Sequence, residues 1–322
     1  MSSELPLVTV IIPTRPGEDE PRALHAVQSL DYPRDRVEVI VARGRQPSVQ
    51  RNTALRAAHG EFIYFLDDDS LPQPGNLRRA WEQFKDAKVA MLGGPNLCPP
   101  EAPLLEQVFA VVLSSLLAFG PSRARYHSVG AIRATSEKEL ILCNLMARRA
   151  PVIALAGFDE ALYPNEENAL MDDLQKQGNK LLYDPQFIAY RRPRPTFTAF
   201  CKMLMTYGRG RAEQFRLHPT PGSALNLVPP LFCVYLVLVP TLAWRFPLGL
   251  WPLAAYALAV LGQTMASVSH HGLGRSLLAS PLLVLTHVFY GLGFWRGLFT
   301  RLKPAGEKPA MEVTLETAGL KE

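Results

Sequence analysis

The chain has 322 residues, a formal net charge of +5 and an ordinary overall composition, so it can form one or two domains with a sizeable core. Its four cysteines show no CxxC spacing, which argues against a zinc site and a disulfide framework and indicates a reducing compartment. Hydrophobic residues are distributed unevenly. The first two thirds mix charged and apolar residues, whereas residues 225–298 are largely apolar.

Strand and helix signals alternate in the N-terminal part of the chain. Strands joined by helices form βαβ units, so we expect an α/β fold with a mostly parallel sheet. Helices are predicted at residues 22–30, 48–59 (with Ser48 as its cap) and 77–84. Continuous apolar runs predict buried strands at residues 8–12, 37–41, 62–66 and 89–92.

Three consecutive aspartates, Asp67, Asp68 and Asp69, follow the third predicted strand. The carboxyl ends of parallel strands form the edge where open α/β sheets bind ligands. Mg²⁺ and Mn²⁺ prefer oxygen ligands, and a magnesium site often combines one or two carboxylates with the phosphates of a nucleotide. A solvated turn is the alternative, since aspartate is common in turns. The run of three after five apolar residues favours the cation site.

The middle of the chain contains a strongly apolar stretch, residues 104–119, with helical character. It is slightly short for a membrane span, so it is predicted to be either a core helix or a helix at the membrane interface. A basic loop and a strand at residues 140–145 are expected after it.

A second acidic site is predicted at Glu166 and Glu167. Asn165 can cap a helix whose first turn favours acidic residues, and this suffices to explain Glu166. Glu167 is three, four and seven residues before Leu170, Met171 and Leu174, so it is predicted to face inward. A carboxylate in that position favours a raised pKa and a role as general base.

The C-terminal third is predicted to associate with a membrane. Residues 225–244, 247–268 and 277–298 are each near the ~20 residues needed to span a bilayer, with almost no charge to cover an outer face. Helices of a second soluble domain are the alternative. A basic strip at residues 191–216 precedes them, which fits the positive-inside rule and anionic headgroups better than nucleic acid.

Membrane topology is ambiguous in the sequence. No signal-peptide pattern precedes the first strand, which places the N-terminal domain in the cytoplasm. Three spans would put the polar tail, predicted to be poorly ordered, outside. Arg296, Arg301 and Lys303 instead favour the cytoplasm. Either one segment is re-entrant, or residues 104–119 embed as well, or the charge rule is overridden.

Taken together, several motifs resemble family 2 inverting glycosyltransferases with the GT-A fold, and in particular membrane-attached bacterial transferases of exopolysaccharide or succinoglycan type. The likeness covers roughly residues 6–215. It rests on the segment from Val8 to Arg15, on Gln50-Arg51-Asn52, on the segment from Gly60 to Asp69, on Gly157-Phe158-Asp159-Glu160, and on Glu166-Glu167.

The resemblance implies a role for each matching residue. Pro13, Thr14 and Arg15 match a loop that contacts the nucleotide. Asn52 belongs to a second motif on the side of the site that binds the nucleotide sugar. Asp67 and Asp68 would approach the nucleotide, Asp69 together with Asp67 would bind Mg²⁺ or Mn²⁺, and Glu167 would be the general base. Weaker candidates are Glu166, then Asn144 and Arg148 on the acceptor side, and Arg191, Arg192 and Arg194 for phosphate or for a cytoplasmic membrane anchor.

Three departures from the family pattern bear on specificity. Residues 41–44 are Val-Ala-Arg-Gly where the family has an acid that reads the base, so both UDP and GDP donors are compatible with the sequence. Glu167 stands where the family usually has aspartate. No Gln-x-x-Arg-Trp motif occurs near residues 209–216, which argues against a processive polymerase.

We therefore expect a metal-dependent inverting glycosyltransferase that acts on a lipid-linked or growing glycan in polysaccharide biosynthesis. Its GT-A domain would comprise residues 1–218, transmembrane helices residues 219–300, and a polar tail residues 301–322. The catalytic domain would lie at the cytoplasmic face of the bacterial inner membrane. Two alternatives are a polyprenyl-phosphate glycosyltransferase and a non-catalytic membrane protein that binds a nucleotide sugar or a partner synthase.

Overall fold

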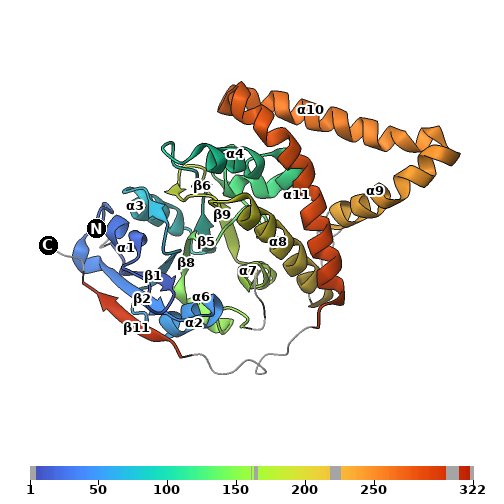
Figure 1. The fold of residues 1–322 in the computed structure, drawn as a ribbon. Coiled ribbons are helices and arrows are strands. Elements are labelled where there is room, and N and C mark those ends of the chain that lie inside the picture. Colours follow the sequence, from blue (N-terminus) through green and yellow to red (C-terminus); the bar gives the residue numbers. More distant parts are fainter. Residues whose placement is uncertain (1–4, 161, 163–165, 218–225, 302–311, 320–322) are drawn as a thin grey trace. The chain divides into compact units, whose positions relative to one another are not determined.

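The structure is a computed structural model that describes residues 5–160, 162, 166–217, 226–301 and 312–319 (Figure 1). The chain forms two compact units. The first comprises Met1–Pro99, Ala124–Arg191 and Lys303–Glu322, and the second comprises Pro100–Arg123 and Arg192–Leu302. The units therefore do not follow a single boundary after residue 218, because residues 100–123 and 192–217 group with the apolar helices.

The first unit is built on an eight-stranded sheet with strand order β11-β2-β1-β3-β8-β5-β9-β7. The pairs β1–β2, β1–β3 and β5–β9 are parallel and the other neighbours are antiparallel. The α/β prediction is confirmed, but the sheet is mixed and not mostly parallel as expected. The strands are β1 (Val8–Thr14), β2 (Val37–Arg43), β3 (Phe62–Leu66), β5 (Val89–Gly93), β7 (Arg133–Ala134), β8 (Asn144–Arg148), β9 (Lys180–Tyr183) and β11 (Thr314–Ala318).

Strand β3 shows why the sheet is covered on both faces. Phe62, Tyr64 and Leu66 belong to one hydrophobic cluster, and Ile63 and Phe65 to the other, because successive side chains of a strand point to opposite faces. All five are fully buried, which explains the uninterrupted apolar run. Helices contribute to both clusters: α1 (Arg22–Val27), α2 (Pro47–Ala57), α3 (Asn76–Phe84), α6 (Arg149–Ala154) and α7 (Glu166–Lys176).

Two local predictions differ from the structure. Helix α2 begins at Pro47 and its cap residue is Gln46, so Ser48 lies inside the helix and does not cap it. Proline is well suited to the first helical position, since its missing N–H would have had no partner there. The strand predicted at residues 140–145 is shifted to Asn144–Arg148, where it runs antiparallel between β3 and β5.

The prediction of a poorly ordered tail is wrong for Thr314–Ala318. This segment forms β11 and pairs antiparallel with β2, with Leu315 opposite Ala42. Val313 and Leu315 pack against the same hydrophobic cluster, and Glu316 forms an ion pair of 2.7 Å with Arg43. The strand covers an edge of the sheet that would otherwise present unpaired backbone groups. Residues 302–311 and 320–322 lie outside the described residues.

Replacing Leu315 by aspartate should loosen β11. The substitution removes apolar packing and places a carboxylate against the cluster, so we expect backbone amides of residues 314–318 to exchange at least about tenfold faster. Hydrogen–deuterium exchange of the C-terminal peptide measures this. Thr317→Asp is the matched control, because Thr317 is exposed on the same strand. Equal exchange in the two variants would contradict the pairing.

The second unit consists of helices. They are α4 (Leu104–Leu113), α5 (Leu116–Phe119), α8 (Phe197–Leu217), α9 (Val228–Arg245), α10 (Trp251–His271) and α11 (Leu273–Phe299). Glycines allow α8 and α11 to approach closely. A Cβ atom added to Gly208 would lie 2.0 Å from the carbonyl oxygen of Tyr290, and one added to Gly293 would lie 2.1 Å from that of Met205. Small residues at such crossings permit close backbone contact.

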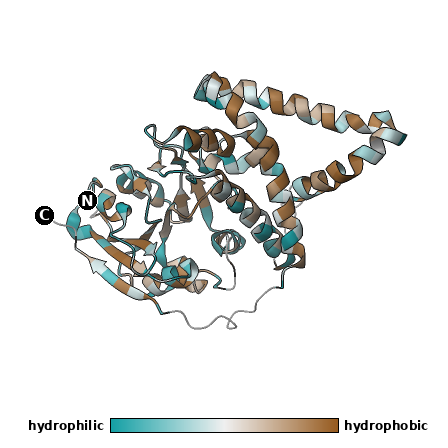
Figure 2. Cartoon of the chain, in the orientation of Figure 1, coloured by the Kyte–Doolittle hydropathy of each residue, from teal (hydrophilic) through white to brown (hydrophobic). Residues whose placement is uncertain are grey.

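Two helical segments are long and apolar enough to cross a membrane, Pro247–His271 and Leu273–Phe299 (Figure 2). In the third predicted span, residues 225–244, helix α9 has Pro240 inside it, and its described residues include a shorter apolar helix, Val228–Thr241. The segments Leu104–Leu113 and Leu116–Arg125 form a pair bent by 59°, which passes the same test only if both are counted as one span. The stretch at residues 104–119 is thus helical but broken.

Candidate functional site

The aspartates lie where two sheets meet within the first unit. Asp67, Asp68 and Asp69 fill the connection between β3 and the short strand β4 (Leu71–Pro72). Strand β4 belongs to a three-stranded sheet with order β4-β10-β6, in which β10 is Ala189–Tyr190 and β6 is Asn96–Leu97. Arg191 directly follows β10. The antiparallel pairing of β10 with β4 therefore brings Arg191 to the aspartates.

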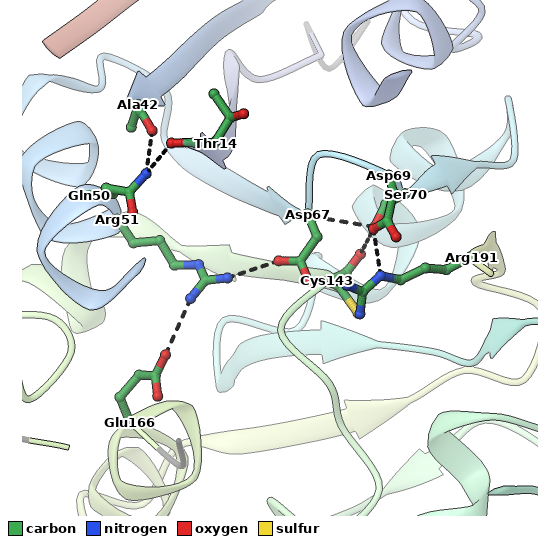
Figure 3. A network of polar contacts seen from close by, with 10 residues as sticks. All are labelled: Thr14, Ala42, Gln50, Arg51, Asp67, Asp69, Ser70, Cys143, Glu166 and Arg191. Carbon is green, nitrogen blue, oxygen red and sulfur yellow. Dashed lines mark hydrogen bonds and ion pairs between the residues drawn. The ribbon is translucent and has the colours of Figure 1, made fainter. Parts of the chain in front are cut away.

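Arg191 binds this aspartate cluster with its whole guanidinium group (Figure 3). Its Nε donates to Asp69 Oδ1 at 2.6 Å, and its Nη2 lies 3.1 Å from Asp67 Oδ2. Its Nη1 donates to the Cys143 sulfur at 3.6 Å. Burial raises the pKa of Cys143 to about 12, so the thiol stays neutral and the aspartates are the charged partners of Arg191.

A second arginine, Arg51, holds the other side of Asp67. Its Nη2 donates to Asp67 Oδ1 at 2.9 Å, and its Nη1 donates to Glu166 Oε1 at 3.3 Å. Arg51 sits on the buried face of α2 together with Ser48, Asn52 and Leu55. The spacing of these four residues could have revealed the buried arginine, yet no role was predicted for it. Arg51 thus joins the aspartate cluster to the predicted catalytic helix α7.

The predicted orientation of the two glutamates is wrong. Glu166 is the buried residue, 3% exposed, whereas Glu167 is only half-buried. Burial raises the pKa of Glu166, the charge of Glu167 adds to this, and Arg51 opposes it. Glu166 Oε2 is buried without a hydrogen-bond partner. Asn165, the predicted cap of this helix, lies outside the described residues.

The loop after β1 is held in place by α2. Pro13 and Thr14 end β1 and are buried, whereas the Arg15 side chain is 81% exposed and lies 3.7 Å from Glu18. Gln50 Nε2 donates to the carbonyl oxygens of Thr14 at 2.8 Å and Ala42 at 2.6 Å. This amide ties together the carboxyl ends of β1 and β2, where the resemblance places the nucleotide.

Two predicted asparagines have structural partners instead. Asn52 Nδ2 donates to Phe158 O at 2.8 Å, and its Oδ1 accepts from Phe158 N at 2.8 Å, so it fixes the turn after Gly157. Asn144 is fully buried, with Tyr64 Oη donating to its Oδ1 at 2.7 Å and its Nδ2 donating to Phe187 O at 2.7 Å. The amide of Asn144 is thus used inside the fold, and its role in an acceptor-side wall stays a prediction.

The remaining weak candidates are Arg148, Arg192 and Arg194. Arg148 pairs with Phe62 at the opposite end of β3, and its Nε donates to Val89 O at 2.9 Å. An acceptor-side role for Arg148 also stays a prediction. Arg192 belongs to the second unit, where both its Nε and Nη2 donate to the buried Glu106, at 2.6 and 2.5 Å. Arg194 is exposed. Among the candidate arginines, Arg191 contacts Asp67 and Asp69.

The donor set around Asp69 suits a divalent cation that is shared with phosphate. Among the residues that the structure describes, no group of three or more His, Cys, Asp or Glu side chains is arranged to hold a metal alone. Asp67 has arginine nitrogens at both carboxylate oxygens, whereas Asp69 is 39% exposed. Magnesium sites often use one or two carboxylates and complete their coordination shell with substrate phosphates and water. Asp69 and a neighbouring aspartate could supply those carboxylates.

Comparison with known proteins defines the class. The fold is of GT-A type: a mannosyltransferase from Pyrobaculum calidifontis, solved with GDP-Man and Mn²⁺, superposes with a TM-score of 0.55 at 17% identity, covering 92% of this chain and 88% of that one. Residues 18–107 match the family described as Glycosyl transferase family 2. These residues thus resemble glycosyltransferase family 2, the family that the motifs predicted.

Two curated relatives agree with this family. A pre-mycofactocin glycosyltransferase from Mycobacterium tuberculosis is 25% identical over 217 residues, which is 67% of this chain and 43% of the relative. The succinoglycan biosynthesis protein ExoA from Rhizobium meliloti is 29% identical over 150 residues, 45% of this chain and 44% of the relative. The chain thus matches less than half the length of each.

Proposed function

We propose that this protein is a metal-dependent inverting glycosyltransferase that moves a sugar from a nucleoside diphosphate donor to a lipid-linked or growing glycan. The observation that carries the proposal is the joining of Asp67 to Arg191 and to Arg51, which in turn reaches Glu166 at the start of α7. Acidic residues that recognise a cation and diphosphate are thereby connected, within one unit, to a carboxylate pair that can serve the acceptor.

Donor binding would use the carboxyl edge of the sheet. The diphosphate would lie beside Asp69, and a bound Mg²⁺ or Mn²⁺ would neutralise the charge that develops on the leaving group. Asp69 and one neighbouring aspartate would hold that ion. Thr14 and Pro13 would border the nucleoside, at the strand ends that Gln50 ties together. The relatives' names do not decide between UDP and GDP.

Glu167 would be the general base. A base has to be ionised and within reach of the acceptor hydroxyl. Glu166 is less suited to this role, because it is buried and one of its oxygens accepts from Arg51. Glu167 is half-buried on the same helical turn. It would take the acceptor proton while the hydroxyl attacks the anomeric carbon opposite the leaving diphosphate, which inverts that centre.

Product analysis tests the reaction. Purified protein should transfer sugar from an α-linked nucleotide donor to give a β-linked product, detected by the anomeric coupling in NMR spectra. A lipid-linked glycan acceptor should be elongated, whereas a polyprenyl phosphate should yield no phosphate-linked monosaccharide. Formation of that monosaccharide would instead establish the polyprenyl-phosphate alternative. A product that retains the anomeric configuration would contradict the proposed mechanism.

The membrane topology that we propose follows from the pairing of β11. Strand β11 pairs with β2, so the chain leaves the first unit after Arg191 and has rejoined it at β11. The chain must therefore cross a bilayer an even number of times, which two spans, α10 and α11, satisfy and three do not. The positive charges of Arg296 and Arg301 favour the cytoplasmic side for the end of α11.

Cysteine accessibility checks this topology. Glu61→Cys in the first unit and Glu312→Cys before β11 should react with a membrane-impermeant maleimide only in inside-out vesicles. Leu273→Cys, at the start of α11, should react only in right-side-out vesicles. The unmodified chain is the control, because its four cysteines are buried or half-buried. Labelling of Glu61→Cys and Glu312→Cys from opposite sides would contradict the arrangement.

A further inference from the structure

Arg191 occupies the place at the aspartate cluster that a cation would need. All three guanidinium nitrogens have a partner there: Asp69 at 2.6 Å, Asp67 at 3.1 Å and the Cys143 sulfur at 3.6 Å. The pairing of β10 with β4 fixes the backbone on either side, so this contact is built into the fold. The Arg191 side chain is only 25% exposed.

Asp67 has little capacity left for a second cation, and Asp69 already shares one oxygen with Arg191. One oxygen of Asp67 accepts from Arg51 and the other lies beside Arg191. Asp69 contributes one oxygen to Arg191. A divalent ion placed on Asp69 would lie within a few ångströms of the guanidinium charge, where like charges repel strongly in a partly buried site. Protein carboxylates alone therefore favour Arg191 over a metal.

We propose that Arg191 is the resident counter-cation of the aspartate cluster. A divalent cation displaces Arg191 from Asp69 only when a diphosphate is present to bind its guanidinium group. A guanidinium binds phosphate oxygens in a bidentate manner. Hydrogen bonds from Arg191 to the diphosphate therefore replace the contact that it loses with the Asp69 carboxylate. Metal and diphosphate would then bind together, each weakly without the other. The inference rests on the metal dependence of the proposed function and adds a positioning role for Arg191.

Direct measurement of Mn²⁺ binding tests this role without any assay of sugar transfer. Binding to the full-length protein is followed by electron paramagnetic resonance, with Mn²⁺ alone and with Mn²⁺ plus inorganic pyrophosphate as the diphosphate probe. We expect the wild type to bind Mn²⁺ at least about tenfold more tightly when pyrophosphate is present. In Arg191→Gln, binding of Mn²⁺ alone should tighten at least about tenfold, and pyrophosphate should add little.

Three variants show whether charge at this position is the cause. Arg191→Lys keeps the charge and should bind Mn²⁺ alone within about threefold of the wild type. Arg78→Gln is the matched control: Arg78 forms an exposed pair with Asp31 at 3.1 Å, and its removal should change nothing. Adding Asp69→Asn to Arg191→Gln should abolish the tighter binding. If that binding persists in the double variant, the ion sits elsewhere and the proposal is wrong.

The outcomes also separate this inference from the proposed function. If the wild type binds Mn²⁺ with pyrophosphate but Arg191→Gln binds Mn²⁺ alone no more tightly than the wild type does, the counter-cation role is overturned and the metal dependence stands. If no form binds Mn²⁺ with pyrophosphate, the metal dependence itself falls, and this inference with it. If Arg191→Gln does not fold, Arg191→Lys provides the test. Binding of Mn²⁺ alone to Arg191→Lys about tenfold more tightly than to the wild type would overturn the counter-cation role of Arg191.

Discussion

Glu167→Gln should lower the rate of sugar transfer by about 10²- to 10⁴-fold, the range that general acid–base catalysis typically contributes. The amide keeps the size of the side chain but cannot accept the acceptor proton. Donor affinity should stay within about threefold of the wild type, because in the proposed site the aspartates and not α7 would hold the donor. The rate of nucleoside diphosphate release, measured with acceptor present, and donor binding, measured by calorimetry, give the two values.

Glu166→Gln is the matched comparison at the neighbouring position. It removes a buried carboxylate that pairs with Arg51 at 3.3 Å and has a raised pKa, so its main effect should be on stability and site geometry. We expect a smaller loss of transfer than for Glu167→Gln. A larger loss in Glu166→Gln, with Glu167→Gln nearly active, would show that the buried glutamate is the base.

Arg51→Met should destabilise the first unit by about 3–5 kcal/mol, because it leaves two carboxylates that were paired with a buried charge. The Arg51 side chain is 7% exposed, and its partners Asp67 and Glu166 are 23% and 4% exposed. Methionine fills a similar volume, so lost packing contributes little. Urea unfolding followed by hydrogen exchange of β3 and α7 peptides measures the change in that unit.

Arg78→Met provides the control for this prediction. Arg78 pairs with Asp31 at 3.1 Å, and both side chains are about half exposed or more, at 49% and 64%. Exposed pairs contribute about 0–1 kcal/mol, so this variant should unfold almost like the wild type. If Arg51→Met is no less stable than Arg78→Met, the arginine is not the electrostatic link between the aspartate cluster and α7.

The parts of the fold that sequence predicted well depend on local pattern. Strand β3 is a run of five apolar residues, and the aspartates that follow are at the carboxyl end of a strand by position alone. The family motifs then identified the same residues. In contrast, β11 has only a weak alternating pattern, and its pairing with β2 joins residues about 270 positions apart, which no local signal encodes.

The site itself was predicted only in part, for two physical reasons. The face of α7 was misjudged because Leu170 and Leu174 lie four and eight residues after Glu166 as well as three and seven after Glu167, so helical spacing fits both glutamates. Arg51 and Arg191 were not assigned to the aspartates because the contacts span 16 and 122 residues of sequence. Only the tertiary pairing of β10 with β4 and the position of α2 bring them there.

Donor binding tests the central claim most directly. The thermal stability of the purified protein should be measured with UDP-, GDP- and dTDP-sugars, each with and without Mn²⁺, for the wild type and Asp69→Asn. We expect one nucleotide class to raise the unfolding temperature of the wild type in the presence of Mn²⁺, and no donor to do so in Asp69→Asn. A stabilisation that survives in Asp69→Asn, or no stabilisation by any donor, would contradict a nucleotide-sugar site at the aspartates.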